Sequence, residues 1–400
     1  MATHAIYRSK HDSIKVKIWV SREPDSTETD ARVHRVLRVF TLANSTGAYG
    51  GPAETAARQS RIAADLGYRV QMLAGRLPCD APYRRGQPYK QVFVPVKTLA
   101  PFSGGFSSMF SWALARQLWR SVGCVDIVHV SFAREMIPAV AAFFSIVRRR
   151  RLIIQPHGML TSRLGLKQFF ADIVARPLYR CADVVVALTE HEKADLATWC
   201  PRYKGEYVVC GNPVPGHDRS RVRQPAKSPT ALFVARLHPR KRVGTFVEAA
   251  WLDSESKLAR FVVAGPDGGD LDIVTAASRA LPNFDYVGAV APEKVLDLLD
   301  SADVFVLTSV KEPWGNVLVS ALSLGIPVIV NQSAALAETI QQFGAGVVVE
   351  DGNAHAVHAA LSELLQDKVF YEACSRGALH LIQQRMGAGT QEAFLLRLYG

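Results

Sequence analysis

An acidic loop between two apolar segments is the first part of this chain whose residue types could do chemistry. Residues 301–331 read SADVFVLTSVKEPWGNVLVSALSLGIPVIVN, with Glu312 in the loop and Gly315 directly before a short helical pattern. A carboxylate there can accept hydrogen bonds from hydroxyl groups, and the amides of Asn316 and Val317, at the helix start, would meet phosphate. A surface acid that caps a helix is the alternative, although an ordinary cap does not need Pro-Trp-Gly-Asn after it.

Two cations follow another apolar segment, ALFVAR, in the loop ARLHPRKR. Arg236 and Lys241 stand five residues apart there. An arginine fork and a lysine point charge can hold a diphosphate and stabilise the negative charge that develops on it as it leaves. Arg240 and Arg242 belong to the same loop, so a solvated basic loop is the alternative interpretation.

A histidine and a glycine pair complete the candidate residues. His157 follows the apolar segment RLIIQ and precedes Gly158, where a purely structural histidine is the alternative. Gly50 and Gly51 separate the first strand from its helix, where backbone amides without a neighbouring Cβ can approach phosphate or sugar. The pair does not form G-x-G-x-x-G, so a dinucleotide site is poorly supported and a plain tight turn is the alternative.

Two series of alternating strands and helices would position these residues. The first series includes VHRVLRVFTL, YRVQMLAG, QVFVPV, DIVHVS, RLIIQ and DVVVALT, with helical segments such as SSMFSWALARQLWRS between them. The second includes ALFVAR, RFVVAG, FDYVGAV, DVFVLTS and PVIVN. This alternation predicts an α/β protein with two Rossmann-like domains, each a doubly wound parallel sheet. Ligands of such sheets bind at the carboxyl ends of the strands.

Composition along the chain predicts the limits of these domains. We expect a disordered N-terminal extension over residues 1–32, where SREPDSTETDAR shows no core-forming pattern, and an N-terminal domain over 33–214. A polar, proline-containing linker is expected over 215–229 and a C-terminal domain over 230–384. A last helix is expected over residues 385–400.

Together these blocks resemble the retaining nucleotide-sugar glycosyltransferases of family 4, which have the two-domain GT-B fold. The resemblance covers residues 33–400. The spacing of arginine, four residues and lysine matches Arg236 and Lys241, and the histidine-glycine turn of the family matches His157. The resemblance implies that the imidazole touches the donor sugar and that Glu312 bonds its hydroxyls.

The resemblance also implies a mechanism and a placement of substrates. The donor would bind the second domain and the acceptor the first, with Gly50 and Gly51 beside both, and the final helix would cross back to the N-terminal domain. Attack would occur on the face that the leaving group vacates, while a donor phosphate oxygen takes the acceptor proton. No protein nucleophile is then needed, which agrees with the absence of a recognisable carboxylate pair for double displacement.

One position departs from the family pattern. That pattern has two glutamates separated by seven residues, and the position of the second is Ser320 here. Because the second glutamate usually holds the nucleotide ribose, the serine puts donor affinity or donor identity in question.

Neither a metal nor a cofactor is expected. Asp270 and Asp272 form a D-x-D sequence, but they open a helical segment after AGPDGG, where carboxylates serve as helix caps. The cysteines and histidines show no metal-ligand spacing. The charge of the leaving group would then be met by Arg236, Lys241 and backbone amides.

The net charge of +11 is distributed unevenly. Residues 1–200 carry 28 Lys and Arg against 15 Asp and Glu, so the N-terminal half holds the whole excess. Such asymmetry favours an anionic partner, nucleic acid or acidic lipid being the usual choices, and solubility alone is the alternative. No nucleic-acid recognition motif is present, so we expect Arg148 to Arg151 to favour an anionic membrane surface.

The remaining composition favours a folded protein of the cytoplasm. The six cysteines form no C-x-x-C pair and are expected to be reduced thiols. No apolar run approaches the roughly 18 residues that span a bilayer, and no signal peptide is recognisable at the N-terminus. We therefore expect a cytoplasmic location, with peripheral attachment to the inner face of a membrane.

The sequence thus predicts a metal-independent, retaining glycosyltransferase that transfers a hexose from a nucleoside diphosphate sugar. We expect the acceptor to be a hydroxyl of a glycan or lipid-linked molecule in cell-envelope polysaccharide or glycolipid assembly. A non-catalytic nucleotide-sugar-binding or scaffolding protein of the same fold is the alternative, motivated by Ser320.

Overall fold

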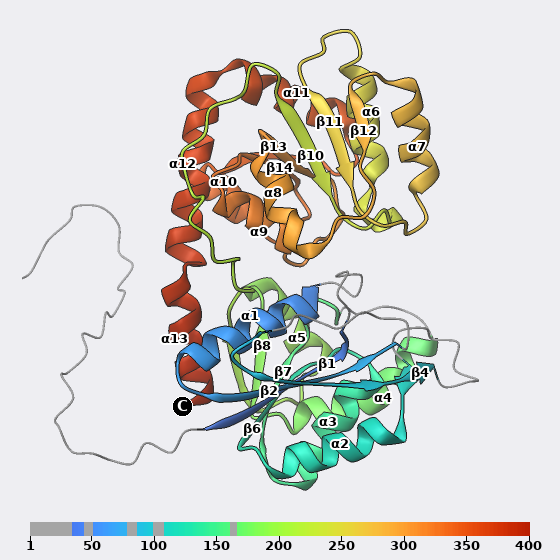
Figure 1. Ribbon diagram of the computed structural model, residues 1–400, viewed down its shortest axis with the longest axis vertical. Helices are drawn as coiled ribbons and strands as arrows, with labels where there is room; N and C mark the ends of the chain where they lie inside the picture. Colours follow the sequence, from blue (N-terminus) through green and yellow to red (C-terminus); the bar gives the residue numbers. More distant parts are fainter. Residues whose placement is uncertain (1–33, 44–50, 78–85, 99–107, 161–165) are drawn as a thin grey trace, which may run out of the picture. The chain divides into compact units, whose positions relative to one another are not determined.

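The first sheet is parallel throughout (Figure 1). In this computed structural model the described residues are 34–43, 51–77, 86–98, 108–160 and 166–400. The strand order is β3-β2-β1-β6-β7-β8-β9. The strands are β1 (Arg35–Leu42), β2 (Arg69–Arg76), β3 (Lys90–Pro95), β6 (Ile127–Ser131), β7 (Arg151–Gln155), β8 (Val184–Ala187) and β9 (Glu206–Val209).

Helices cover both faces of this sheet, because successive residues of its strands point to opposite sides. In β1, Leu37 and Val39 join one apolar cluster, whereas Val36 and Phe40 join the other. The first cluster packs under α2 (Trp112–Gly123), α3 (Met136–Val147), α4 (Leu166–Arg180) and α5 (Glu190–Trp199). The second packs under α1 (Gly51–Asp65) and α13 (Ala388–Tyr399).

The expected helix over SSMFSWALARQLWRS begins later than the sequence pattern indicates. Met109–Phe110 forms a short strand, β5, which pairs antiparallel with β4 (Lys97–Thr98). Helix α2 begins only at Trp112, because the side chain of Ser111 accepts a hydrogen bond of 3.1 Å from the amide of Leu114 and caps the helix. The helical prediction was therefore wrong for the first residues of that segment.

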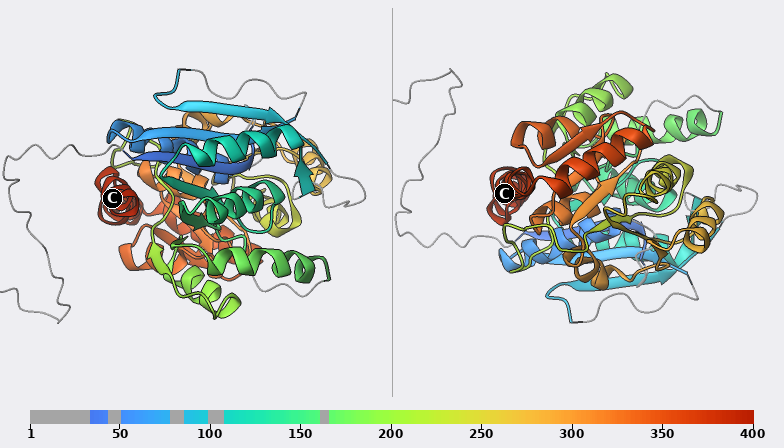
Figure 2. Two further views of the ribbon diagram at one scale, coloured as in Figure 1. Left: turned by 90° about the horizontal axis from the view of Figure 1, so that it is seen from below. Right: turned by 90° about the horizontal axis from the view of Figure 1, so that it is seen from above.

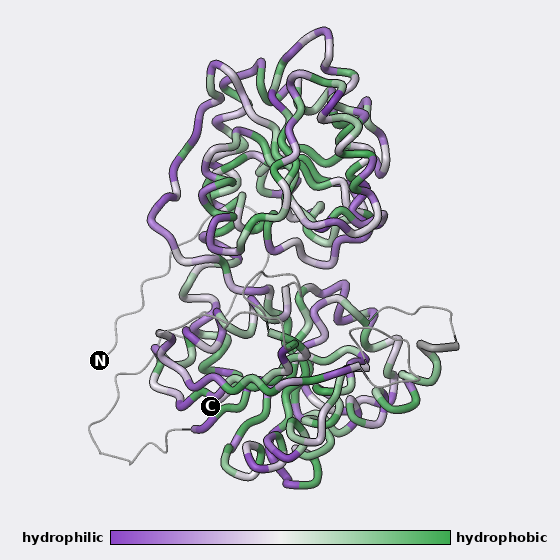
Figure 3. Tube along the Cα trace, turned by 45° about the vertical axis from the view of Figure 1, so that its right-hand side comes forward, coloured by the Kyte–Doolittle hydropathy of each residue, from purple (hydrophilic) through white to green (hydrophobic). Residues whose placement is uncertain are grey.

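The second sheet is also parallel, with the order β12-β11-β10-β13-β14-β15. Its strands are β10 (Thr230–Val234), β11 (Arg260–Ala264), β12 (Phe284–Tyr286), β13 (Val304–Leu307), β14 (Val328–Asn331) and β15 (Gly346–Val349). The hydropathy colours show hydrophobic residues concentrated at the centre of each sheet (Figure 3). Parallel strands buried on both faces are expected to be apolar along their whole length.

Two groups of helices cover the second sheet. One face is covered mainly by α8 (Val295–Asp300), α9 (Asn316–Ser323), α10 (Ala337–Phe343) and α12 (Lys368–Arg385). The other is covered by α6 (Val243–Leu252), α7 (Leu271–Ala280) and α11 (Ala354–Gln366). Two short 3-10 turns, η2 (Pro239–Lys241) and η3 (Pro292–Lys294), precede α6 and α8.

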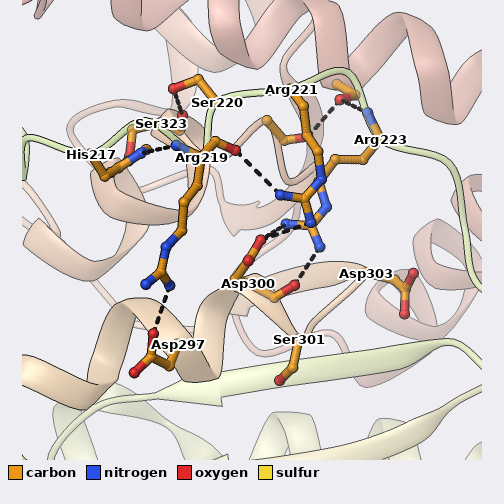
Figure 4. Close-up of polar contacts among 12 residues, drawn as sticks. His217, Arg219, Ser220, Arg221, Arg223, Asp297, Asp300, Ser301, Asp303 and Ser323 are labelled. Atoms are coloured by element: carbon orange, nitrogen blue, oxygen red, sulfur yellow. Dashed lines mark hydrogen bonds and ion pairs between the residues drawn. The ribbon is translucent and has the colours of Figure 1, made fainter.

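The polar segment between the two sheets is held against the second one by charged and polar contacts (Figure 4). Arg219 pairs with Asp297 at 2.6 Å, and Arg223 pairs with Asp300 at 3.2 Å. His217 lies 2.8 Å from the hydroxyl of Ser323. The composition of residues 215–229 predicts a linker, and the structure shows that its middle part is fixed to helices α8 and α9.

The chain returns to the first sheet through its last two helices, α12 and α13 (Figure 1), and Figure 2 shows the C-terminal helix end-on. Helix α13 packs on α1, and the Tyr399 ring meets Tyr68 edge-on at 5.4 Å between centroids. The Tyr399 hydroxyl also lies 3.0 Å from Nδ1 of His129 in β6. Val33–Gly400 form one compact unit, whereas residues 1–32 lie outside the described residues, and the domain limits drawn from the sequence stay predictions.

The described helices include none with the length and apolar character that crossing a bilayer requires.

Helix α12 approaches the end of α10 closely at Gly377. A Cβ at this position would lie 2.4 Å from the carbonyl oxygens of Phe343 and Gly344. We expect Gly377→Ala to lower the free energy of unfolding by about 1–3 kcal/mol, the usual cost of overpacking, because backbone atoms cannot move aside singly. Urea unfolding followed by circular dichroism measures this change.

Gly389→Ala in α13 is the matched control, because no atom lies within 4 Å of a Cβ at that position. Alanine loses less backbone entropy than glycine in a helix, so this variant should be up to about 1 kcal/mol more stable than the wild type. Equal shifts in the two variants would show that the close approach of α12 and α10 does not require glycine.

Candidate functional site

The acidic loop follows β13 and ends at a left-handed glycine. Gly315 has φ 75° and is the residue that directly precedes α9, so the helix begins at Asn316 as the sequence pattern predicts. The left-handed backbone there favours glycine over residues with a side chain. Asn316 and Val317 are the first two residues of α9, where backbone amides lack intrahelical acceptors and can bind an anion.

Glu312 and Lys241 form an ion pair across two loops. The Glu312 side chain is only 7% exposed and that of Lys241 is 20% exposed. The loop that carries Lys241 is held in turn by Thr308, whose hydroxyl donates to the carbonyl oxygens of Lys241 at 3.1 Å and Arg242 at 2.8 Å. The structure thus brings together one cation and one anion that the sequence analysis singled out.

The carboxyl group of Glu312 is held in its ionised form. Burial by itself raises its pKa, but the charge of Lys241 and the hydrogen bond from it, with smaller contributions from Arg240 and Ser309, leave the pKa below its ordinary value. An ionised carboxylate is only an acceptor of hydrogen bonds. The free acceptor positions of Glu312 are therefore suited to hydroxyl donors.

Arg236 lies at the end of the strand β10, on the same connection as Lys241. Its side chain is exposed, and its Cγ atom stands 2.9 Å from the place that a Cβ on Gly268 would take. The absence of a side chain at Gly268, in the loop after β11, therefore leaves room for the aliphatic part of the Arg236 side chain. The structure places Arg236 at the same edge of the second sheet as Glu312, because both loops follow neighbouring parallel strands.

His157 follows β7 in a strained conformation. Its φ is 56°, an uncommon value for a residue other than glycine, and the residue is only 6% exposed. Nε2 lies 3.0 Å from the hydroxyl of Ser131, and Nδ1 is buried without a hydrogen bond of regular geometry among the described residues, although the Asn212 side chain is near enough to act on the imidazole. Burial, followed by the charge of Arg38, lowers the pKa of the imidazole to about 3, so His157 is neutral at physiological pH.

A buried glutamate holds the turn after His157. The Glu192 carboxylate accepts hydrogen bonds from the amide of Gly158 at 2.5 Å and from the amide of Leu188 at 2.6 Å. Burial raises the pKa of Glu192, and these two amide bonds oppose that rise. The side chain of Thr189 caps α5 by accepting from the Glu192 amide at 3.1 Å. The spacing Thr-x-x-Glu is a capping-box signature, so this supporting residue was readable from the sequence but was missed.

The acidic loop touches loops of the first sheet at two points where only glycine fits. A Cβ on Gly158 would lie 2.1 Å from Cβ of Pro313, and a Cβ on Gly211 would lie 1.9 Å from the ring of Trp314. Trp314 itself is only 6% exposed. The contacts bring the loop that carries Glu312 against the turn that carries His157.

A third contact involves the start of α9. The Asn212 side chain donates a hydrogen bond of 2.9 Å to the side chain of Asn316. Gly51 lies next to the same residue, because a Cβ there would stand 2.8 Å from Nδ2 of Asn316. Gly51 is the first residue of α1, so the helix begins two residues earlier than the sequence pattern indicates, whereas Gly50 lies outside the described residues. Gly51 and the amide-rich start of α9 are therefore neighbours.

Ser320 is buried in the middle of α9. It is 5% exposed, and its hydroxyl donates a hydrogen bond of 2.9 Å to the carbonyl oxygen of Asn316 one turn earlier. The hydroxyl hydrogen is therefore already used within the helix. Any contact of Ser320 with a ligand would have to use the remaining lone pairs of the oxygen.

A small cavity of about 50 Å³ lies at the carboxyl edge of the first sheet. Three of its lining residues have side-chain oxygens: Thr41, Ser131 and Glu135. The rest of the lining is apolar and consists of Phe40, Leu42, Pro52, Ala53 and Met159. The Glu135 carboxylate accepts hydrogen bonds from the amides of Ala133 at 2.9 Å and Arg134 at 3.1 Å. Burial raises the pKa of this carboxyl group, and the amide bonds oppose the rise.

The sequence analysis missed Ser131 and Glu135 as site residues. Ser131 ends the apolar strand DIVHVS and Glu135 follows it by four residues, so a polar residue at or just after the carboxyl end of such a strand is the signal that could have found them. Asn212 and Trp314 were also missed as contact residues. Their roles depend on contacts between loops far apart in the chain, which no local pattern indicates.

Other possible sites lie apart from these residues. Asp270 directly precedes α7 as predicted, but its side chain makes no capping hydrogen bond. The described part of the chain contains no group of three or more His, Cys, Asp or Glu side chains that could hold a metal ion. A wide, open hollow of about 760 Å³ is lined by residues of α6 and of the segment 350–355, and by none of the predicted site residues.

Two family models match the chain in tandem. The family described as Glycosyl transferase 4-like domain matches residues 50–213, and the family described as Glycosyl transferases group 1 matches residues 217–380. The matched ranges include all the site residues predicted from the sequence.

Relatives of known name match over different lengths. The D-inositol 3-phosphate glycosyltransferase of Thermobispora bispora is 25% identical over 413 residues, which cover 92% of this chain and 96% of that protein. The probable sucrose-phosphate synthase 5 of Oryza sativa subsp. japonica is 26% identical over 178 residues, or 39% of this chain. The match spans only 17% of the length of that synthase.

Solved structures show the fold. The sucrose-phosphate synthase from Thermosynechococcus elongatus has a TM-score of 0.68 and 18% identity, covering 92% of this chain and 98% of that one. HepE from Anabaena, in complex with UDP and glucose, has a TM-score of 0.65 and 18% identity, covering 91% of this chain and 99% of that one. The predicted GT-B fold, with two parallel α/β sheets, is confirmed.

The neutral state of His157 predicts a pH dependence of stability. Its pKa is about 3 in the folded protein against 6.5 for an ordinary histidine, so the unfolded chain binds one more proton between these values. The free energy of unfolding should therefore fall as pH drops from 6.5 toward 3, by about 1.4 kcal/mol per pH unit for this group. His157→Asn, which tolerates the left-handed backbone, should remove this contribution.

Urea unfolding of both proteins between pH 5 and 8 measures this contribution. We expect the stability difference between wild type and His157→Asn to be constant above pH 7 and to shift by about 2 kcal/mol in favour of the variant by pH 5. His129, whose pKa is lowered mainly by burial and by the charge of Arg38, is present in both proteins, so most of its contribution cancels in the difference. Parallel stability curves would show that His157 is not held neutral by the fold.

Proposed function

This chain belongs to the group 1 glycosyl transferases and is a glycosyltransferase, and from that premise we propose that it transfers a hexosyl group from a nucleoside diphosphate sugar to an acceptor hydroxyl. The observation that carries the proposal is the ion pair of Lys241 and Glu312 beside the start of α9. This arrangement offers acceptors for sugar hydroxyls and donors for phosphate at one edge of the second sheet. The donor therefore binds there.

The two cations act on the leaving group. A lysine ammonium has three hydrogens, so Lys241 can keep Glu312 and still donate to a phosphate oxygen. Arg236 adds a planar fork from the same connection, and the amides of Asn316 and Val317 add backbone donors. These groups stabilise the negative charge that develops on the nucleoside diphosphate, so the proposed reaction needs neither a metal nor a cofactor.

His157 acts beside the sugar in its neutral form. The transition state of glycosyl transfer carries positive charge on the sugar ring, and a neutral imidazole does not oppose that charge. The unpaired Nδ1 atom is available to a hydroxyl. Transfer retains the anomeric configuration: the acceptor attacks the face that the leaving group vacates, and a donor phosphate oxygen accepts its proton. No protein residue becomes covalently bound.

The small cavity at the first sheet supports a place for the acceptor. Ser131 and Glu135 offer oxygen acceptors there, and Ser131 also contacts His157. An acceptor hydroxyl at this cavity would therefore approach the imidazole. We propose a glycan or lipid-linked acceptor of the cell envelope, because the basic N-terminal half favours work beside an anionic membrane in the cytoplasm.

A screen of nucleoside diphosphate sugars tests the proposed function. UDP-glucose is the first donor to try, since HepE from Anabaena has been solved with UDP-glucose. Donor hydrolysis and transfer are measured with and without a chelator, and NMR of the product reports its anomeric configuration. Turnover that a chelator abolishes would contradict metal independence, and an inverted product would contradict retention.

A non-catalytic nucleotide-sugar-binding protein is the second candidate, and the observation that favours it is Ser320 in place of the second glutamate. Calorimetry separates the two candidates when it accompanies the screen. Donor binding without hydrolysis or transfer for any acceptor supports the second candidate, whereas turnover removes it.

The diphosphate assignment predicts unequal effects within one basic loop. Arg236→Ala and Lys241→Ala should each lower kcat/KM by about 10²–10³, the usual effect of removing one electrostatic contact in a transition state. Arg240→Ala, between them, is the matched control and should cost less than about tenfold, because Arg240 acts on Glu312 only at longer range. Similar small losses in all three variants would favour a basic loop that is merely solvated.

The serine at position 320 predicts that a glutamate there would strengthen nucleotide binding. Ser320→Glu should tighten binding of the cognate nucleoside diphosphate by about 1–2 kcal/mol, the size of a charge-assisted hydrogen bond to the ribose. Ser320→Ala, which removes the hydroxyl and adds no charge, should change the affinity little. Isothermal calorimetry measures both variants. Weaker binding in Ser320→Glu would show that another residue holds the ribose or that the added carboxylate repels the phosphates.

A further inference from the structure

Two neighbouring helices of the first sheet expose large apolar side chains together. On α3, Phe143 is 53% exposed and Val147 is 51% exposed. On α4, the exposed fractions are 62% for Phe169 and 64% for Phe170. We call this surface the α3–α4 face.

Two further residues of α4 extend the α3–α4 face. Ile173 is 55% exposed and Val174 is 58% exposed. They follow Phe169 and Phe170 by one helical turn, so the four side chains form one stripe along the helix. The sheet-facing side of α4 is separate, because Ala175, Leu178 and Tyr179 are buried in the core. Burying the core therefore does not require the outer stripe.

Basic residues surround the α3–α4 face. Residues 112–180 contain 11 Lys and Arg but only three Asp and Glu. Arg148 and Arg149 follow α3 directly and are exposed, and Arg176 and Arg180 lie on α4. The charge excess of the N-terminal half is therefore concentrated on the helices that expose the apolar residues.

The acidic residue of α4 is mostly buried and reduces this surface charge only in part. The Asp172 side chain is only 13% exposed, and it pairs with Arg134 at 2.7 Å. It also accepts a hydrogen bond of 3.0 Å from the indole nitrogen of Trp199. Asp172 is thus turned toward its partners on the protein, but these include Arg176 at 3.7 Å as well as Arg134, so it offsets part of the charge on the outer side of α4.

We propose that the α3–α4 face binds the surface of a membrane that contains anionic lipid. Phenylalanine and aliphatic side chains gain free energy on entering the acyl boundary, and the surrounding arginines meet lipid phosphate groups. An exposed apolar patch with a charged rim marks an interaction surface. Anionic lipid complements both parts of this surface.

Two other partners fit the surface less well. A second copy of the chain would place the same arginines opposite one another across a two-fold axis, where like charges repel. Nucleic acid would match the arginines, and its bases could stack on the three phenylalanines, but it would leave the aliphatic Val147, Ile173 and Val174 without an apolar partner. The combination of aliphatic residues and arginines therefore favours lipid.

The direction of α4 gives the contact a place relative to the site. Helix α4 follows β7 and the His157 turn, so its first residues lie at the carboxyl edge of the sheet. Phe169 and Phe170 belong to this end of the helix. A membrane contact here would hold the enzyme with its acceptor cavity near the lipid surface, a consequence that rests on the proposed function.

Vesicle co-sedimentation of the full chain tests the contact without using turnover. Vesicles of phosphatidylcholine with 30% phosphatidylglycerol, roughly the anionic content of many membranes, are compared with pure phosphatidylcholine. We expect binding to the anionic vesicles that weakens as salt is raised, because exposed charges are screened. Equal binding to both kinds of vesicle, or none to either, would overturn the proposal.

A matched pair of variants tests the surface itself. Ile173→Asp with Val174→Asp should weaken vesicle binding at least about tenfold, because two apolar groups are lost and two negative charges are added. Ile273→Asp with Val369→Asp is the control, since these residues are exposed on α7 and α12 of the second sheet. Equal binding of the two variants would place the contact elsewhere, and melting temperatures confirm that both fold.

The arginines are tested in the same way. Arg149→Gln with Arg180→Gln should weaken binding to anionic vesicles about 30-fold, since each basic residue near such a surface contributes about 1 kcal/mol. Arg279→Gln with Lys294→Gln, both exposed on the second sheet's helices, should leave binding unchanged. Sedimentation equilibrium of the wild type and the Ile173→Asp/Val174→Asp variant completes the test. A dimer that this variant dissociates, without vesicle binding, would identify a second copy as the partner.

Discussion

The ion pair between Lys241 and Glu312 is the interaction on which the candidate site depends. Burial alone would favour a protonated Glu312, and the lysine reverses that tendency. Removing one partner of a buried pair leaves an uncompensated charge, which costs more than the pair contributes. The pair therefore fixes the protonation of the carboxylate and the position of the cation at once. The Thr308 hydroxyl donates hydrogen bonds to the backbone of the Lys241 loop and so helps to fix the position of the lysine.

Charge and burial also give the two halves of the candidate site different charges. The second sheet contributes a charged pair, whereas the first sheet contributes a histidine that burial and Arg38 keep neutral. Positive charge is thus available where phosphate is expected, and the imidazole beside the proposed place of the sugar adds none. Glycines at 158 and 211 allow the loops that carry these groups to touch, because any Cβ there would meet Pro313 or Trp314.

Sequence reasoning predicted the parts that local patterns determine. Apolar runs of four to eight residues located most strands of both sheets, and Gly315 marked the start of α9. It placed a helix over Met109–Phe110, where a two-residue strand has too little length to show a period. Asn212 and Trp314 were missed because their contacts join residues many positions apart, whereas Ser131 was missed although it ends an apolar strand. The pairing of Glu312 with Lys241, 71 positions away, likewise became visible only in three dimensions.

The docked linker limits how the two sheets can move. Residues 217–223 are fixed to the second sheet by ion pairs of Arg219 and Arg223. The chain therefore crosses from the first domain to the second before residue 217. The second crossing is the short break between α12 and α13, at residues 386–387. Two domains that are joined by two short connections can rotate relative to each other mainly about the line that passes through both connections. Any opening of the site is then a turn of one hinge whose axis these two crossings define.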